Sequence, residues 1–381
     1  MPNAPSNDSG TVSVQNWAAA DAILDRAAEA TAISPAAMVK LLESPTPNDL
    51  NKLFAAARQA RDRHFGNTVF LYGFLYVSTY CRNHCRFCLY RRNNHRAIRY
   101  RKTLSQISES ARHLVRAGVH LIDLTAGEDP CFYGHGEDAF TPIVDTVRSI
   151  RKDTGLPLMI SVGKVADTDL ERLAAAGAEW YACYQETHNR HLFNQLRAGQ
   201  SYRSRYRSKV LAKAKGLLVE EGLLCGAGET PADLVHSLVA MARLGADQVR
   251  AMTFVPQPGT PMQDRSAATP LRELVMIALM RLVFPHLLVP ASLDVNGLAG
   301  LRERLDAGAN VVTSLVPPNQ GLAGVAQRRL DIEAGRRTVA HVTRTLEACN
   351  LAPATRDQYL SWIRLRKGAA VLADERDAAK C

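Results

Sequence analysis

The most constraining feature of this 381-residue sequence is a unit that recurs from about residue 110 onward. In each unit a helical stretch ends in a glycine, and a short apolar run follows at once. Glycine closes a helix by taking the left-handed conformation, and a nearly continuous apolar run is typical of a strand buried on both faces. The units are RAGVHLIDLTA, AAGAEWYACY, EEGLLCGAG, RLGADQVRAMTF and DAGANVVTSLV, whose strands are expected to end near 126, 184, 228, 254 and 316. Repeated helix-then-strand units predict a parallel sheet.

Three further apolar runs bring the expected strands to eight. They lie at 69–78, 156–163 and 286–293. Helices are expected at 103–117, 139–152, 166–176, 204–220, 231–244, 270–283, 297–307 and 333–349. Eight strand–helix units with right-handed crossovers predict an α/β fold of the (β/α)8 TIM-barrel type, with an open doubly wound sheet as the alternative.

The remaining segments suggest a simple domain organisation. We expect a disordered leader at 1–16, N-terminal helices at 17–63, the barrel at 64–350 and a C-terminal tail at 351–381. Within the N-terminal helices, SPAAMVKLL and TPNDLNKLFAAARQARDRHF each open on a residue that can cap a helix.

Composition excludes several classes of protein. No apolar run reaches the roughly 18 residues that span a bilayer, and the N-terminus does not resemble a secretory signal. Eight cysteines are too sparse for a disulfide scaffold, so we expect a reducing, cytoplasmic location. The net charge of +10 is spread over many segments, and the densest stretch, 91–101, reads as a solvated or anion-facing loop. We therefore expect neither a membrane nor a nucleic acid as partner.

Three cysteines directly follow the first expected strand. Cys81, Cys85 and Cys88 form a C-x3-C-x2-C array in STYCRNHCRFCLY, at the end of a barrel strand where active sites lie. Three thiolates on one loop can bind three irons of a 4Fe–4S cubane and leave the fourth iron without a protein ligand. A zinc site or three unrelated thiols are the alternatives, but no second cysteine pair or histidine follows at zinc-ribbon spacing.

This array, with aromatic Phe87 before the last cysteine, resembles the signature of the radical S-adenosylmethionine (SAM) superfamily. The resemblance implies a 4Fe–4S cluster on Cys81, Cys85 and Cys88, which are then both metal ligands and catalytic residues. It also implies SAM as a second cofactor. In that superfamily the open iron binds the amino and carboxylate groups of SAM, and the reduced cluster releases a 5′-deoxyadenosyl radical.

Further SAM-binding residues follow from the same resemblance. TAGEDP resembles the glycine-rich stretch that holds the methionine amino group, and it supplies Gly127 and Glu128, although Ala126 replaces the first glycine. Glu186 and Arg205 resemble a pair that contacts SAM in biotin-synthase-like members, where the arginine binds the carboxylate. A surface position is the alternative for Arg205.

Two more positions complete the implied SAM site. Gly226 lies in GLLCGAGET, which resembles the stretch that supports adenine, although a glycine-rich turn alone is weak support. Tyr90, two residues after the last cysteine, is assigned to SAM as well.

Longer strings narrow the resemblance to one family. HFGNTVFLYGFLYVSTYC, IDLTAGEDP, YQET, LRAGQS, VRAMTFVPQPGTP, PASLDVNG and AGANVVTSLVPP resemble the methylornithine synthase family of pyrrolysine biosynthesis. The resemblance implies an isomerase that converts L-lysine to (3R)-3-methyl-D-ornithine, the first step of that pathway. The radical takes hydrogen from lysine, the Cα–Cβ bond breaks, and the fragments rejoin at the neighbouring carbon while SAM is regenerated. A flavodoxin or ferredoxin is the expected electron donor.

Four residues near strand ends suit an amino-acid substrate. Arg250 could pair with an α-carboxylate, while Ser292 and Asp294 could accept from an ammonium group, with Asp123 beside them. Buried charges are costly unless a ligand or another side chain satisfies them, so an ion-pair network without a ligand is the alternative. The resemblance implies substrate contacts at the same four positions.

Two rival functions stay open at this stage. One is another biotin-synthase-like radical SAM enzyme, such as a diiron-hydrogenase maturase. Cys183 and Cys225 would suit a relative with an auxiliary cluster, although small buried cysteines are common. The other is an RNA-binding barrel with a structural cluster.

Overall fold

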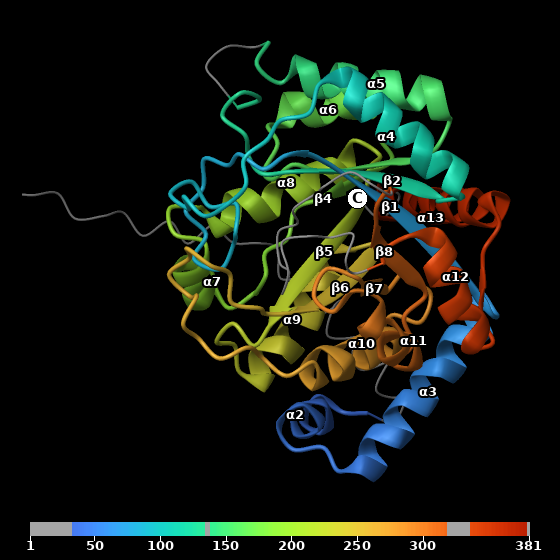
Figure 1. The fold of residues 1–381 in the computed structure, drawn as a ribbon. Helices are drawn as coiled ribbons and strands as arrows, with labels where there is room; N and C mark the ends of the chain where they lie inside the picture. Colours follow the sequence, from blue (N-terminus) through green and yellow to red (C-terminus); the bar gives the residue numbers. More distant parts are fainter. Residues whose placement is uncertain (1–32, 134–137, 318–335, 379–381) are drawn as a thin grey trace, which may run out of the picture.

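Eight parallel strands surround a common axis, and helices cover their outer faces (Figure 1). The computed structural model describes residues 33–133, 138–317 and 336–378. The barrel strands are β1 Thr68–Ser78, β2 Leu121–Ala126, β3 Leu158–Ser161, β4 Trp180–Ala182, β5 Leu218–Cys225, β6 Gln248–Thr253, β7 Pro290–Ser292 and β8 Val311–Leu315. Their order is β6-β5-β4-β3-β2-β1-β8-β7, and a single parallel bridge between Gln248 and Leu288 brings β6 back to β7. The predicted (β/α)8 barrel is confirmed, and the open sheet is excluded.

Helices alternate with these strands as the sequence pattern predicts. They are α2 Pro35–Glu43, α3 Pro47–Phe65, α4 Leu104–Ala117, α5 Thr141–Thr154, α6 Asp167–Ala175, α7 Arg190–Leu196, α8 Tyr202–Ala214, α9 Pro231–Leu244, α10 Leu271–Val283, the short 3-10 helix η1 Gly297–Gly300, α11 Leu301–Asp306, α12 Val339–Ala348 and α13 Arg356–Ala378. In the described ranges, no helix is long and apolar enough to span a bilayer. The expected leader at 1–16 lies outside the described residues.

Two predicted helix boundaries are wrong. The helix expected at 333–349 begins only at Val339, because the described residues 336–338 are not helical. The helix expected at 204–220 ends at Ala214, and Gly216 takes a positive φ of 77° that turns the chain into β5. The error arose because Glu220 and Glu221 look like residues of an exposed helix. Both are fully buried on β5, where each carboxylate has a basic partner: Arg250 for Glu220 and Lys209 for Glu221.

Alternate residues of β1 serve two different layers. Phe70, Tyr72, Phe74 and Tyr76 point into the barrel and form part of its interior cluster. The intervening Val69, Leu71, Leu75 and Val77 pack beneath the surrounding helices. This alternation follows from the period of two of a strand, and it lines the barrel axis with aromatic rings.

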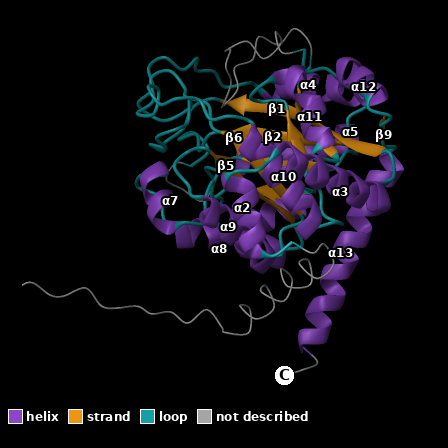
Figure 2. Cartoon of the chain, turned by 90° about the horizontal axis from the view of Figure 1, so that it is seen from below, coloured by secondary structure: helices purple, strands orange, loops and turns teal. Residues whose placement is uncertain are grey.

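The N-terminal end of the barrel is closed by the chain's C-terminal segment. The short strand β9, Ala352–Pro353, pairs with the start of β1. Helix α13 then places Tyr359 within hydrogen-bonding distance of the Tyr72 hydroxyl (2.7 Å) and stacks Trp362 on Trp180. The segment that the sequence suggested as a tail therefore seals the barrel, while the last turns of α13 extend beyond it (Figure 2).

We expect Tyr359→Ala to destabilise the protein by about 3 kcal/mol, because it empties a fully buried aromatic site in the barrel floor. Thermal or urea unfolding would measure the loss. Leu365→Ala, at a side chain on the same helix that is 75% exposed, is the control and should change the stability little. Equal stabilities of the two variants would contradict a sealing role for α13.

Candidate active site

The cysteine loop lies at the C-terminal end of β1 and is held by one arginine. The guanidinium of Arg99 donates to the backbone carbonyls of Thr79, Tyr90, Arg91 and Asn94. Cys85 is buried, whereas Cys81 and Cys88 are half-buried. These contacts fix the loop through its main chain, so its three thiols are presented from a preformed backbone.

Burial and neighbouring thiols oppose the ionisation of Cys81 and Cys88. Burial, followed by the neighbouring Cys85, raises the pKa of Cys81, and the same two causes hold the pKa of Cys88 far above its usual range. A cationic metal centre bound by all three would remove this repulsion. Among the described residues, no three His, Cys, Asp or Glu side chains converge on a single ion. A cubane distributes its ligands over separate irons, so the loop fits a 4Fe–4S cluster better than zinc.

The turn after β2 packs directly against the cysteine loop. A Cβ added to Gly127 would lie 2.7 Å from the Cβ of Cys81, so only glycine fits this close approach. Glu128 follows, and its carboxylate accepts from the Lys164 backbone N–H at 3.0 Å and from Arg82 at 3.0 Å. Burial acts to raise the pKa of Glu128, but Arg205 and the Lys164 N–H outweigh it, and the pKa is lowered.

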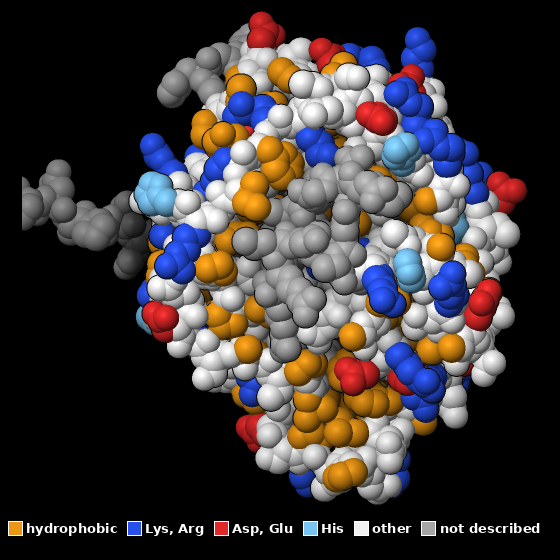
Figure 3. Space-filling view, in the orientation of Figure 1, with side chains coloured by type: hydrophobic (Ala, Val, Ile, Leu, Met, Phe, Trp, Pro, Cys, Tyr) orange, Lys and Arg blue, Asp and Glu red, His pale blue; other side chains and the backbone are white. Residues whose placement is uncertain are grey.

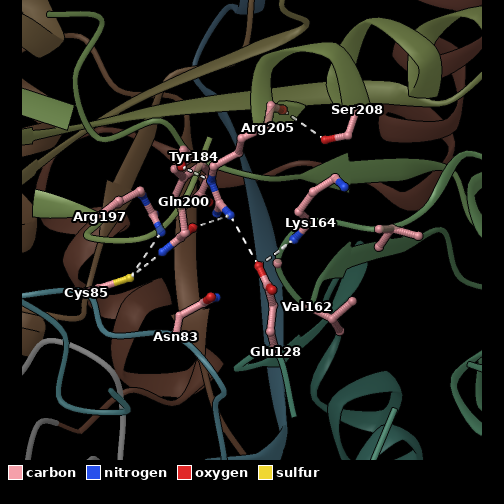
Figure 4. A network of polar contacts seen from close by, with 12 residues as sticks. Asn83, Cys85, Glu128, Val162, Lys164, Tyr184, Arg197, Gln200, Arg205 and Ser208 are labelled. Atoms are coloured by element: carbon pink, nitrogen blue, oxygen red, sulfur yellow. Dashed lines mark hydrogen bonds and ion pairs between the residues drawn. The ribbon is translucent and has the colours of Figure 1, made fainter. Parts of the chain in front are cut away.

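Arg205 reaches the same site from α8 (Figure 4). Its Nε donates to the Tyr184 carbonyl at 2.8 Å, and its Nη1 lies 3.4 Å from Glu128 Oε1 and 3.3 Å from Gln200 Oε1. Because Arg205 is only 5% exposed, the surface alternative is wrong. Its backbone and side-chain contacts hold the guanidinium beside the turn after β2.

Glu186 sits after β4 in a left-handed conformation, with φ of 67°. Its Oε1 accepts from Arg197 at 2.6 Å, and its Oε2 has no hydrogen-bond partner in the described part of the chain. Burial raises the pKa of Glu186, against the opposing effect of Arg197. A buried carboxylate oxygen on a strained backbone is a common feature of ligand sites.

The two remaining SAM candidates are buried or constrained. Gly226 has φ of 90°, and its N–H donates to the Glu229 carboxylate at 2.6 Å, so the turn is organised by its own glutamate. Tyr90 is 2% exposed, and its pKa is raised far above the usual range by burial, with Cys88 among the nearby charges.

Arg250 lies in the barrel interior and is clamped from several sides. Its Nε donates to Glu220 Oε1 at 2.7 Å, and its Nη1 donates to Thr313 at 3.2 Å. The guanidinium carbon lies 5.8 Å from the ring centre of Phe74 and 5.6 Å from that of Tyr184. Its Nη2 is buried without a partner among the described residues, so the clamp leaves one N–H group for a ligand.

Asp123 of β2 is the second group in this layer that lacks a partner. It is fully buried, and neither carboxylate oxygen has a partner in hydrogen-bonding geometry within the described ranges. Burial raises the pKa of Asp123 to about 7, although the nearby Ser161 hydroxyl and Arg250 act to lower it. A ligand cation at this position would favour the ionised carboxylate.

Ser292 and Asp294 lie together at the end of β7. The Ser292 hydroxyl donates to Asp294 Oδ2 at 3.1 Å. Asp294 Oδ1 accepts from Arg337 at 3.0 Å and from the Tyr76 hydroxyl at 3.2 Å. The four substrate candidates are thus not one hydrogen-bonded cluster: Ser292 and Asp294 touch, whereas Arg250 and Asp123 interact only through their charges.

Sequence reasoning missed four charged or polar residues of the site, namely Arg197, Gln200, Glu220 and Arg337. Arg197 and Gln200 lie in the LRAGQS string, which was noted only as part of a resemblance. Glu220 was assigned to a helix, and no local pattern distinguished Arg337. By contrast, Cys183 and Cys225 lie in the apolar layer between sheet and helices, which gives an auxiliary cluster no support.

Comparison with known proteins agrees with this geometry. The radical SAM superfamily model matches residues 75–240. A 3-methylornithine synthase of Methanosarcina acetivorans is 41% identical over 85% of this chain and 91% of its own length. The FeFe hydrogenase maturase subunit HydE of Thermotoga maritima is 32% identical over 68% of this chain and 74% of that protein. The crystal structure of a methylornithine synthase superposes with a TM-score of 0.83 at 39% identity, covering 89% of this chain and 99% of that one.

The protein is a radical SAM enzyme, which uses a 4Fe–4S cluster and SAM. Two findings define this class: the parallel barrel with a three-cysteine loop at the end of β1, and the match to the superfamily model. Within that class, the family is identified by the extent of sequence identity to the 3-methylornithine synthases. The chain belongs to the 3-methylornithine synthase family of the superfamily.

The raised pKa of Asp123 predicts a pH-dependent cost to stability. The unfolded carboxyl ionises near its model value of 3.8, but the folded one ionises only near 7, so ligand-free stability should fall as the pH rises through this interval. Asp123→Asn removes the cost, which is at most about 4 kcal/mol above pH 7. We expect the variant to melt higher than the unmodified protein at pH 8 and at a similar temperature near pH 4.

The control for this measurement is Asp145→Asn, at an exposed carboxylate on α5 paired with Arg148. This substitution should leave the dependence of stability on pH unchanged. A constant difference between Asp123→Asn and the unmodified protein from pH 4 to pH 8 would refute the shifted ionisation.

Proposed function

We propose that this protein converts L-lysine to (3R)-3-methyl-D-ornithine as the first step of pyrrolysine biosynthesis. The relatives named 3-methylornithine synthase support the reaction. The observation in the structure that carries it is the pair of unsatisfied buried groups in the barrel interior, the Asp123 carboxylate and Arg250 Nη2. They are suited to an ammonium and a carboxylate, the two charged ends of an amino acid.

The balance of charge in this layer favours a dibasic amino acid. Asp123, Glu220 and Asp294 are accompanied by two arginines, Arg250 and Arg337. Glu220 and Asp294 are ion-paired, so Asp123 is the acid in excess within the described chain. L-lysine carries one net positive charge at neutral pH and would balance it, whereas a neutral side chain would leave a buried charge uncompensated.

The roles of the side chains follow from their surroundings. Arg250 would hold the α-carboxylate, since its charge is fixed by Glu220 and its ring contacts restrict its orientation. Asp123, Ser292 and Asp294 would receive the ammonium groups. The aromatic interior excludes water around the reacting carbon chain, which protects radical fragments from side reactions.

On the cofactor side, Cys81, Cys85 and Cys88 would hold the cluster, while Gly127, Glu128, Glu186 and Arg205 would hold SAM, with Tyr90 and Gly226 beside them. When bound, these cofactors supply a 5′-deoxyadenosyl radical that takes a hydrogen atom from the substrate. The protein contributes orientation, and the overall reaction is an isomerisation in which product and substrate have the same composition.

The proposal includes a reducing, cytoplasmic compartment and a small electron-transfer protein, such as a flavodoxin or ferredoxin, as reductant. The absence of disulfides among the seven described cysteines supports such a compartment. An RNA-binding role gains no support from the surface in Figure 3, where basic side chains lie in separate groups among acidic and apolar ones.

Anaerobic turnover tests the assignment directly. The reconstituted protein, with SAM, dithionite and L-lysine, should form a product of unchanged mass that co-elutes with (3R)-3-methyl-D-ornithine on chiral separation. Cys85→Ala should abolish it, because one cluster ligand is lost. L-Norleucine, which lacks the terminal ammonium, should not react. Intact lysine alongside active SAM cleavage would reject the substrate but retain the superfamily.

Arg250→Lys tests the proposed carboxylate contact. A lysine side chain at position 250 keeps the positive charge. Its single ammonium group cannot donate to Glu220, Thr313 and a ligand in the fixed planar geometry of a guanidinium. We expect KM for L-lysine to rise about tenfold or more, equivalent to at least about 1.4 kcal/mol of binding, with a smaller change in kcat. Arg148→Lys, at an exposed position on α5, is the matched control. An unchanged KM would remove Arg250 from substrate binding.

A further inference from the structure

One cluster cysteine is contacted by side chains from a distant segment. The Cys85 sulfur accepts from Gln200 Nε2 at 3.0 Å and from Arg197 Nη1 at 3.5 Å (Figure 4). The Cys81 sulfur, for comparison, accepts a local backbone N–H from Asn83 at 3.5 Å. Cys85 thus has two polar donors placed against it by tertiary structure.

The segment after α7 is docked on the cysteine loop by further contacts. The Arg86 backbone N–H donates to the Leu196 carbonyl at 2.8 Å. The Arg197 guanidinium carbon lies 5.4 Å from the centre of the Phe87 ring. Both contacts are made by the two residues that directly follow Cys85 in the loop, so the segment that carries the two donors is fixed close to the Cys85 sulfur.

Arg197 also joins the sulfur to the SAM side of the site. Its Nη2 donates to Glu186 Oε1 at 2.6 Å, and both side chains are less than one-tenth exposed. The carboxylate therefore partly neutralises the guanidinium next to the sulfur. Because the pair is buried, solvent screens these charges weakly, and their effect on a neighbouring metal centre is strong.

We propose that Arg197 and Gln200 raise the reduction potential of the cluster, and that Glu186 limits this effect. One-electron reduction takes the cluster from its 2+ to its 1+ state, which places more negative charge on its sulfurs. N–H donors and a nearby cation stabilise that state, and an anion destabilises it. Arg197 and Gln200 act on the cluster through their contacts with the Cys85 sulfur. The proposal rests on the cluster alone, not on lysine as substrate.

An anaerobic redox titration of the reconstituted protein without SAM, followed by electron paramagnetic resonance of the reduced cluster, measures this effect. Gln200→Leu and Arg197→Gln should each reduce the equilibrium constant for one-electron reduction about tenfold, a shift of about 59 mV to lower potential. Glu186→Gln should shift the potential in the opposite direction, because it leaves the charge of Arg197 uncompensated.

Gln195→Leu is the matched control, since Gln195 belongs to α7 but is exposed and contacts His191. Only preparations with about four irons per chain are compared. If the Arg197→Gln variant does not retain the cluster, the test rests on Gln200→Leu and Gln200→Glu. We expect Gln200→Glu to lower the reduction potential more than Gln200→Leu. Potentials within error of the control for both Gln200 variants would overturn the proposal. Shifts of the same sign for Arg197→Gln and Glu186→Gln would also overturn it. Neither result bears on whether the unmodified protein converts L-lysine. The proposal on the reduction potential and the proposed reaction can therefore fail independently.

Discussion

The constraint on which the whole site depends is the cost of burying charge at the mouth of an apolar barrel. Each ionised group there needs a counter-charge, because water cannot reach it. The described acids meet arginines: Glu128 with Arg205, Glu186 with Arg197, Glu220 with Arg250, and Asp294 with Arg337. Asp123 is the exception, and its unsatisfied oxygens lie where a substrate ammonium would complete the pattern.

The same pairs connect the parts of the site to one another. Arg205 joins α8 to the turn after β2, and Arg197 joins Glu186 to the cysteine loop. Arg99 donates to the carbonyls of that loop and so fixes the main chain that carries the three cysteines. At the opposite end of the strands, α13 closes the barrel with aromatic rings. The residues proposed to hold the cluster, SAM and substrate therefore belong to one connected framework, which suits chemistry that depends on the orientation of a radical.

Much of the fold could be predicted, because it follows from local patterns. Helices that close on glycine identified five of the barrel strands, and three further apolar runs identified the others. The failures came where the local pattern contradicted the tertiary environment. Glu220 and Glu221 had the appearance of a helix end, yet basic partners on neighbouring elements, Arg250 of β6 and Lys209 of α8, allow both to be buried in a strand. The sealing role of α13 was missed because Tyr359 and Trp362 find their partners only across the barrel floor.

The sequence by itself determined the barrel, the three-cysteine loop and the class of cofactor, because each rests on residues that are close together in the chain. Only the tertiary structure decided which carboxylates are satisfied and which is left for a ligand. It also decided that Cys85 receives donors from Arg197 and Gln200, more than a hundred residues away. The physical reason is that pairing between buried charges depends on distances across the barrel, which chain spacing does not encode.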